Sequence, residues 1–258
     1  MPRARILTNT ESVDDYLKAI LELSGPNEQR VTSNAIAERL NVRAASVTGM
    51  LQKLAAGRPS LIQYEKHHGA RLTPSGKRRA LEVLRHHRLL ERFLHDFLSY
   101  GWDEVHEEAE RLEHFISEKL EDRIAAILGD PQTDPHGHAI PERSGALSQC
   151  TEVNLLNWAC GIPAKVSSVS DRDPSALREI GRLGLRPGIK IIVEAAIRNA
   201  SLRVRIGAQP KAERLNRQLA AQVYVVPLAS KPDIGSEMEA DRTGYGTRRH
   251  VVSSTEGR

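Results

Sequence analysis

Cysteine and long apolar segments are scarce in this sequence. Its 258 residues include two cysteines, Cys150 and Cys160. Two thiols are too few for a disulfide framework or a cysteine-rich zinc site, so we expect both to be free in a reducing compartment. No apolar run is long enough to cross a bilayer, and residues 1–10 lack the apolar centre of a signal peptide. These absences predict a cytoplasmic protein with no membrane partner.

The motifs of common enzyme classes are missing as well. The sequence has no phosphate-binding glycine loop and no nucleophile elbow. Residues 106–110 come nearest to a zinc-protease motif, but Glu110 stands where that motif needs its second histidine. The alternative, a metal-dependent hydrolase with a DNA-binding appendage, therefore lacks a complete signature. We expect a protein that is not an enzyme and has no small-molecule substrate.

Charge is distributed unevenly along the chain, although the net charge is only +4. The net charge is +6 for residues 1–85, −8 for residues 86–140 and +6 for the remainder. A basic block is typical of a protein that binds a polyanion, and an acidic block is typical of a cation site. The alternative is that the uneven charge only aids solubility.

Residues 1–76 have the pattern of a winged helix-turn-helix domain. A capping box at 12–15 opens a first helix, and two short helices are predicted over 34–40 and 44–56. Residues 61–73 have the pattern of a β-hairpin, which would form the wing. In such a domain the helix after the tight turn enters the major groove. Some winged helices bind proteins instead, but the basic charge favours double-stranded DNA as the partner.

The expected DNA contacts lie on the second and third helices. Small polar side chains of the third helix would read bases, basic side chains beside them would hold phosphates, and free N–H groups at the start of the second helix can hold another phosphate. The base-reading residues are Ser46 and Thr48, and the basic residues are Arg43 and Lys53. Ser33 and Asn34 lie at the start of the second helix.

Residues 77–141 are expected to form a helical domain. Its first helix begins just before the domain, at residue 74, and its second covers 102–128; both are rich in candidate metal ligands. Like charges three or four residues apart destabilise a helix. The crowding of Glu110 and Glu113 on one side of the second helix therefore suggests a bound cation. The alternative is an acidic face that only contacts water. Apolar stripes beside the ligands are too large for two helices to bury, which predicts a homodimer. The ligands are His87 and Glu91 on the first helix, and His106, Glu110, Glu113 and His114 on the second.

Several ordered motifs within residues 10–141 resemble the diphtheria-toxin-repressor and manganese-transport-regulator family. They are the segments 10–17, 36–40, 46–48, 72–77, 87–91 and 113–114. The resemblance implies a mainly α protein with an N-terminal winged helix-turn-helix, a helical metal-binding and dimerisation domain, and a small C-terminal β domain. It also implies a metal-activated repressor that binds palindromic operators as a dimer and controls metal-ion homeostasis.

The resemblance also assigns metal ligands. A primary site would use Asp15, Glu110, Glu113 and His114, with His87 in the same region, and an ancillary site would use Glu91 and His106 together with His87. The alternative for Asp15 is a role as the acid of the capping box, and the alternative for His87 and His106 is that they are ordinary histidines of the helix surface.

The end of the chain is expected to contribute a small β domain and a tail. Residues 147–228 resemble the SH3-like domain found in many of these repressors and in ferrous-iron transport accessory proteins, chiefly through 183–188. The resemblance places Asp173 near the ancillary site. The loop before this domain carries His136, which matches a ligand of some manganese-responsive members, while Asp134 replaces their cysteine. Residues 229–258 are polar and lack apolar periodicity, which predicts a disordered tail.

The choice of metal follows from ligand chemistry within the family. Iron-type members place Met and Cys where this chain has Asp15 and Glu110, whereas manganese-type members place carboxylates there. Hard oxygen ligands favour Mn(II). However, Lys18 replaces a second carboxylate of a two-metal manganese site, so Fe(II) remains the alternative.

Overall fold

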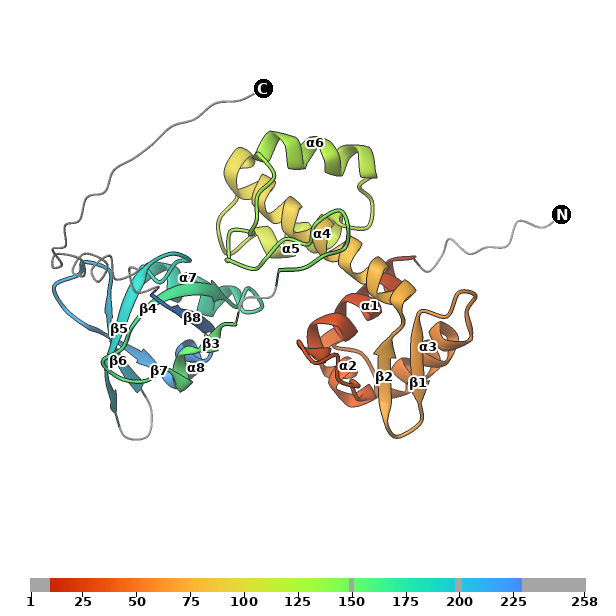
Figure 1. Cartoon of the computed structure of the whole chain (residues 1–258), viewed down its shortest axis with the longest axis horizontal. Helices are drawn as coiled ribbons and strands as arrows, with labels where there is room; N and C mark the ends of the chain where they lie inside the picture. Colours follow the sequence, from red (N-terminus) through yellow and green to blue (C-terminus); the bar gives the residue numbers. More distant parts are fainter. Residues whose placement is uncertain (1–9, 149–150, 198–200, 229–258) are drawn as a thin grey trace, which may run out of the picture. The chain divides into compact units, whose positions relative to one another are not determined.

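The first part of the fold is a winged helix-turn-helix. A computed structural model describes residues 10–148, 151–197 and 201–228. Within them, the elements of this part follow one another as predicted, and Figure 1 shows them grouped beside the start of the next helix. They are α1 (Thr10–Ser24), α2 (Ser33–Leu40), α3 (Ala44–Ala56), β1 (Ile62–Glu65) and β2 (Gly69–Leu72).

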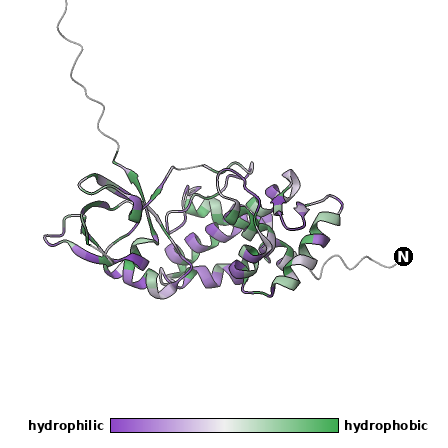
Figure 2. Ribbon diagram, turned by 90° about the horizontal axis from the view of Figure 1, so that it is seen from below, coloured by the Kyte–Doolittle hydropathy of each residue, from purple (hydrophilic) through white to green (hydrophobic). Residues whose placement is uncertain are grey.

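Local signals explain where these elements begin and end. The hydroxyl of Thr32 accepts a hydrogen bond from the Ala35 amide and caps α2, and Asn41 ends it in the left-handed conformation. Leu17, Ile36 and Leu51 from the three helices are fully buried together. In Figure 2 hydrophilic and hydrophobic stretches alternate along the helices, as expected of amphipathic elements.

The helical part that follows differs from the prediction. The helix α4 (Pro74–Leu98) follows the Thr73 cap and ends before Ser99, which adopts the left-handed conformation. The predicted single helix over 102–128 is wrong, because the structure has α5 (Val105–Leu112) and α6 (Glu118–Leu128). Ser117 adopts an extended conformation and its hydroxyl accepts from the Leu120 amide, so it caps a new helix and breaks the old one.

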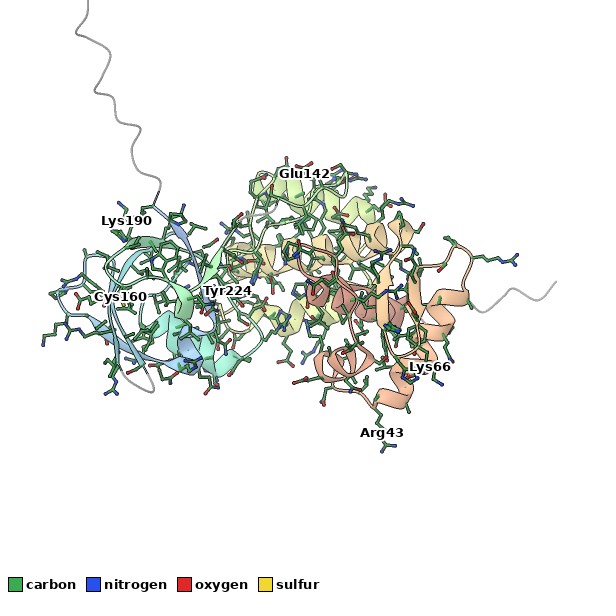
Figure 3. The ribbon with its side chains drawn as sticks, turned by 60° about the horizontal axis from the view of Figure 1, so that its bottom comes forward. Arg43, Lys66, Glu142, Cys160, Lys190 and Tyr224 are labelled. Atoms are coloured by element: carbon green, nitrogen blue, oxygen red, sulfur yellow. The ribbon has the colours of Figure 1, made fainter. Side chains whose placement is uncertain are left out.

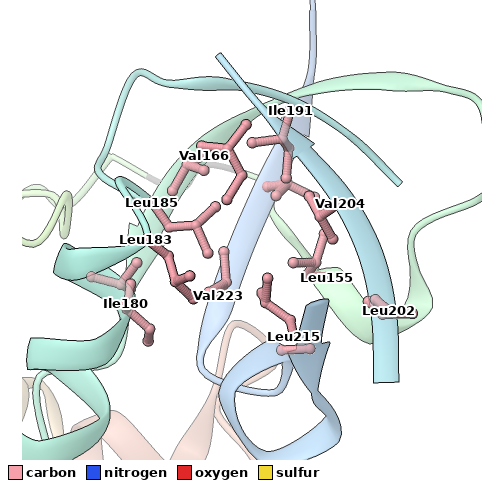
Figure 4. Close-up of a cluster of buried hydrophobic side chains, with 14 of the residues drawn as sticks. Leu155, Val166, Ile180, Leu183, Leu185, Ile191, Leu202, Val204, Leu215 and Val223 are labelled. Carbon is pink, nitrogen blue, oxygen red and sulfur yellow. The ribbon is translucent and has the colours of Figure 1, made fainter. Parts of the chain in front are cut away.

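The third part is a small antiparallel β domain. Its six strands lie in the order β3-β8-β4-β5-β6-β7 around a core of branched aliphatic side chains (Figure 4). Register shifts in the β4–β8 and β5–β6 pairs let the strands bend around this core. The elements are β3 (Val153–Asn154), the short 3-10 helix η2 (Leu155–Asn157), β4 (Pro163–Val169), α7 (Pro174–Arg182), β5 (Lys190–Ile197), β6 (Ser201–Ile206), β7 (Glu213–Asn216), α8 (Arg217–Ala220) and β8 (Val223–Pro227).

The residues expected to form a tail, 229–258, lie outside the part of the chain that the structure describes. Among the described helices, none is long and apolar enough to span a bilayer.

Candidate metal centre

The carboxylates of Glu110 and Glu113 converge on the ammonium group of Lys18. Lys18 comes from α1, Glu110 from α5, and Glu113 directly follows α5. The Lys18 Nζ atom lies 2.8 Å from Glu110 Oε1 and 2.6 and 2.8 Å from the two oxygens of Glu113. Burial opposes the charged ammonium, but the two carboxylates outweigh it and raise the pKa of Lys18. This cluster joins α1 of the winged helix-turn-helix to the helical part.

Asp15 lies beside the same cluster and faces His114. The His114 Nε2 atom is 3.1 Å from Asp15 Oδ1 and 3.6 Å from Glu113 Oε1. The neighbouring carboxylates of Asp14 and Asp15 raise the pKa of His114 to about 10. One turn of α1 and the turn after α5 therefore present two carboxylates and an imidazole to a common point.

His87 connects this cluster to a second group of ligands. Its Nδ1 atom is 2.6 Å from Glu113 Oε2, and its Nε2 atom is 3.0 Å from Glu91 Oε1. His106 Nδ1 lies 3.1 Å from the same Glu91 oxygen and 3.5 Å from Asp171 Oδ2. Burial would lower the pKa of His87, but Glu91 and Glu113 raise it to about 10. Glu91 is completely buried.

The loop before the β domain adds His136 to this second group. Its Nε2–H donates to the Trp102 carbonyl at 2.8 Å, so Nδ1 is the free nitrogen of the neutral ring. That nitrogen faces Glu91 Oε2 at 3.7 Å and Asp171 Oδ2 at 4.0 Å. Gly137 presses against β4, where a Cβ atom would lie 2.1 Å from the Ser167 carbonyl oxygen. The loop is thereby held against the ligand group.

Asp134 shapes this loop and also meets His138. Its Oδ1 atom accepts hydrogen bonds from the amides of His136 and His138, and its Oδ2 atom lies 3.1 Å from His138 Nδ1. Burial would lower the pKa of His138, but Asp134 raises it to about 9. Asp134 is therefore a turn residue whose second oxygen also faces the ligand group.

Three buried polar atoms that lack hydrogen-bond partners within the described part of the chain indicate that these residues suit a metal ion. Glu91 Oε2, His114 Nδ1 and His136 Nδ1 have no hydrogen-bond partner among the described residues. A buried polar atom without a partner costs about 1–3 kcal/mol, so each such atom calls for an explanation. Glu91 Oε2 and His136 Nδ1 face each other, too far apart for a hydrogen bond and close enough for a shared cation. The oxygen and nitrogen donors fit a divalent first-row metal.

The structure places Asp173 away from the cluster, which corrects its expected position. Its Oδ1 atom accepts from the amides of Ser175 and Ala176 at 2.9 and 3.2 Å, so it caps α7. Asp171, two residues earlier, reaches His106 and His136 instead. Asp171 and His138 were missed by the sequence reasoning. The only signals for them were the acid pair around Arg172 and the second histidine of the 136–138 segment.

The residues expected to contact DNA lie on the accessible side of the winged helix. Arg43 precedes α3 and Lys53 lies in its last turn, and both are exposed. Figure 3 shows Arg43 extending away from the domain, with Lys66 of the wing on the same part of the chain. Ser46 and Asn34 are exposed, whereas Ser33 and Thr48 are partly buried. The Thr48 hydroxyl donates to the Ala44 carbonyl.

Three family sequence models match successive parts of the chain. Residues 8–70 match the N-terminal DNA binding domain of iron dependent repressors, residues 73–142 match their metal binding and dimerisation domain, and residues 153–227 match the FeoA domain.

Known proteins match across the same parts. The iron-dependent repressor IdeR of Mycobacterium leprae (strain TN) is 36% identical over 200 residues, which cover 72% of this chain and 85% of the relative. The diphtheria toxin repressor of Corynebacterium diphtheriae is 34% identical over 133 residues, which cover 51% of this chain and 57% of the relative. A solved manganese-dependent transcriptional repressor in complex with manganese is 36% identical with a TM-score of 0.77, covering 84% of this chain and 100% of that chain.

Proposed function

The chain belongs to the family of metal-dependent, DNA-binding repressors that includes the iron-dependent and diphtheria toxin repressors, and from this premise we propose that it is a homodimeric repressor activated by Mn(II). The observation that carries the proposal is the partly buried set of ligands between α1 and the helical part. Asp15 lies on α1 of the winged helix-turn-helix, whereas Glu110, Glu113 and His114 belong to the helical part. A cation shared by these side chains would fix one part against the other.

Two groups of ligands are proposed. Asp15, Glu110, Glu113 and His114 form the first, and His87 stands between the groups. The second group consists of Glu91, His106, His136 and Asp171, with Asp134 and His138 beside it. A divalent cation held by these groups would add positive charge beside their carboxylates and reduce the mutual repulsion.

The proposed mechanism is a population shift among orientations of the winged helix relative to the helical part. A cation held by Asp15 and Glu113 would fix α1 to the turn after α5 and give the winged helix one orientation. In a dimer, fixed winged helices present α3 at the spacing of two operator half-sites, with Arg43 and Lys53 at the phosphates. Without the cation, more orientations are populated and DNA binding weakens.

The homodimer is proposed from exposed apolar side chains on the helical part. Such side chains are normal when scattered, but here several occur on α4, α6 and the turn between α5 and α6. A second copy of this surface would cover them. They are Phe97 (53% exposed), Leu98 (53%), Phe115 (71%), Leu120 (46%) and Ile127 (57%).

Mn(II) is preferred to Fe(II) because carboxylates occupy the first group. Asp15, Glu110 and Glu113 supply oxygen, and His114 supplies the one nitrogen. Fe(II) is the second candidate, since relatives of this chain include iron-dependent repressors. Metal analysis of anaerobically purified protein, with gel-shift titrations in Mn(II) and in Fe(II), decides between them. DNA binding activated by Fe(II) but not by Mn(II), with iron and no manganese in the purified protein, would overturn the choice.

A further inference from the structure

Lys18 is a buried cation at the point where the proposed metal ligands meet. Its side chain is on α1 and the residue is 3% exposed. The ammonium has three N–H donors, and it makes three contacts of 2.6–2.8 Å to carboxylate oxygens of Glu110 and Glu113. These carboxylates follow it by more than 90 residues. The contacts therefore tie two distant segments of the chain together.

A buried ammonium is stable only beside partners that compensate its lost hydration. Glu113 is 1% exposed and gives both of its oxygens to Lys18. A divalent cation needs oxygens of the same side chains, and it would stand close to the ammonium charge. Like charges repel strongly at such short range in a poorly hydrated site.

We propose that Lys18 is a built-in cation of the sensor: it holds α1 to Glu110 and Glu113 before metal arrives, and it competes with the incoming metal for their oxygens. The inference rests on the proposed metal function of those carboxylates. Lys18 is in this sense a positioning residue that sets the metal concentration at which the sensor responds.

Removing the Lys18 charge should therefore strengthen metal binding and weaken the packing of α1 in the metal-free protein. Removing the Lys18 charge strengthens metal binding, because the carboxylates lose their competitor. The same change loosens α1 in the metal-free protein, because no other described cation contacts both Glu110 and Glu113 at hydrogen-bond distance. A lysine that served only folding would not produce tighter metal binding when removed.

The test uses the full chain with Lys18→Met and Lys18→Gln, and Mn(II) alone as the titrant in calorimetry at fixed pH. Lys77→Met is the matched control, because it removes the same charge from an exposed ion pair with Glu28 that involves none of the proposed ligands. Circular dichroism establishes that each variant is folded, and the glutamine variant keeps a polar group if methionine does not fold.

We expect both Lys18 variants to bind Mn(II) at least about tenfold more tightly than wild type, which corresponds to about 1.4 kcal/mol. Hydrogen exchange in residues 10–24 of the metal-free protein should be faster in both, and Lys77→Met should change neither quantity. Unchanged or weaker binding in folded Lys18 variants, with wild type binding Mn(II), would overturn the role of Lys18 alone. No binding by any variant would overturn the metal function and this inference together.

Discussion

Replacing Asp171 by asparagine should weaken metal binding, whereas the same replacement at Asp173 should not. The two acids lie two residues apart at the start of α7, yet they face different surroundings. Asp171 Oδ2 is within 4.0 Å of nitrogens of His106, His136 and His138, whereas Asp173 caps α7. Asparagine is also a good N-cap, so Asp173→Asn keeps the helix start intact.

The size of the effect follows from the charge that asparagine removes. Two unit charges about 4 Å apart interact by about 4 kcal/mol at an effective dielectric constant of 20. Asp171 has a side chain that is 15% exposed, so water screens part of this interaction. A loss of about 2 kcal/mol, or about 30-fold in affinity, is the expected effect of Asp171→Asn. Asp173→Asn should stay within about threefold of wild type.

Calorimetric titration of both variants with Mn(II) measures this difference, with thermal unfolding as a check that each is folded. Mn(II) binding at the second ligand group should weaken for Asp171→Asn only. Equal affinities for the two variants would refute the assignment of Asp171 to the ligand group. A larger loss for Asp173→Asn would show that Asp173, and not Asp171, belongs to the ligand group.

Three further predictions concern DNA, the dimer and pH. Lys53→Ala should weaken DNA binding alike across sequences and reduce the slope of log affinity against log salt by about one, measured by fluorescence anisotropy; a change in sequence preference would contradict a phosphate contact. Phe115→Glu should give a folded monomer in sedimentation experiments because Phe115 is 71% exposed, and an unchanged dimer would move the interface elsewhere. Mn(II) affinity should rise at least about tenfold per pH unit between pH 6 and 8, because neighbouring carboxylates raise the pKa values of His87 and His114 to about 10, and each must lose a proton to bind metal. A flat profile in calorimetry would contradict their roles as ligands.

The winged helix was predictable because its signals are local. The cap at Thr32, the left-handed Asn41 and the hairpin turn before Gly69 each act within a few residues. Gly69 shows why a glycine is required there: its φ is +92°, and a Cβ atom would lie 2.3 Å from the Val31 carbonyl oxygen.

The break between α5 and α6 was missed because the apolar spacing continues across it. The cap at Ser117 was a weaker signal in the sequence than that periodicity, but it determines the local structure. The break turns Phe115 outward and leaves Glu113 buried beside Lys18.

Long-range contacts set the parts of the site that sequence reasoning could not place. Asp171 is 65 residues beyond His106, and its position depends on how the segment after β4 meets the loop that carries His136. The family resemblance implies that Lys18 replaces a carboxylate, but the reach of its side chain to Glu110 and Glu113 is a property of the packed helices.

The most direct test of a metal-activated repressor is DNA binding before and after metal removal. A duplex selected from a random pool with Mn(II)-loaded protein is titrated in Mn(II), then in chelator, then with Mn(II) restored, using wild type and Glu113→Gln. Wild type should bind tightly, lose at least about tenfold in affinity with chelator and recover fully, while Glu113→Gln stays folded and dimeric and binds weakly throughout. DNA binding by wild type that is equally tight in chelator and in Mn(II) would contradict the account.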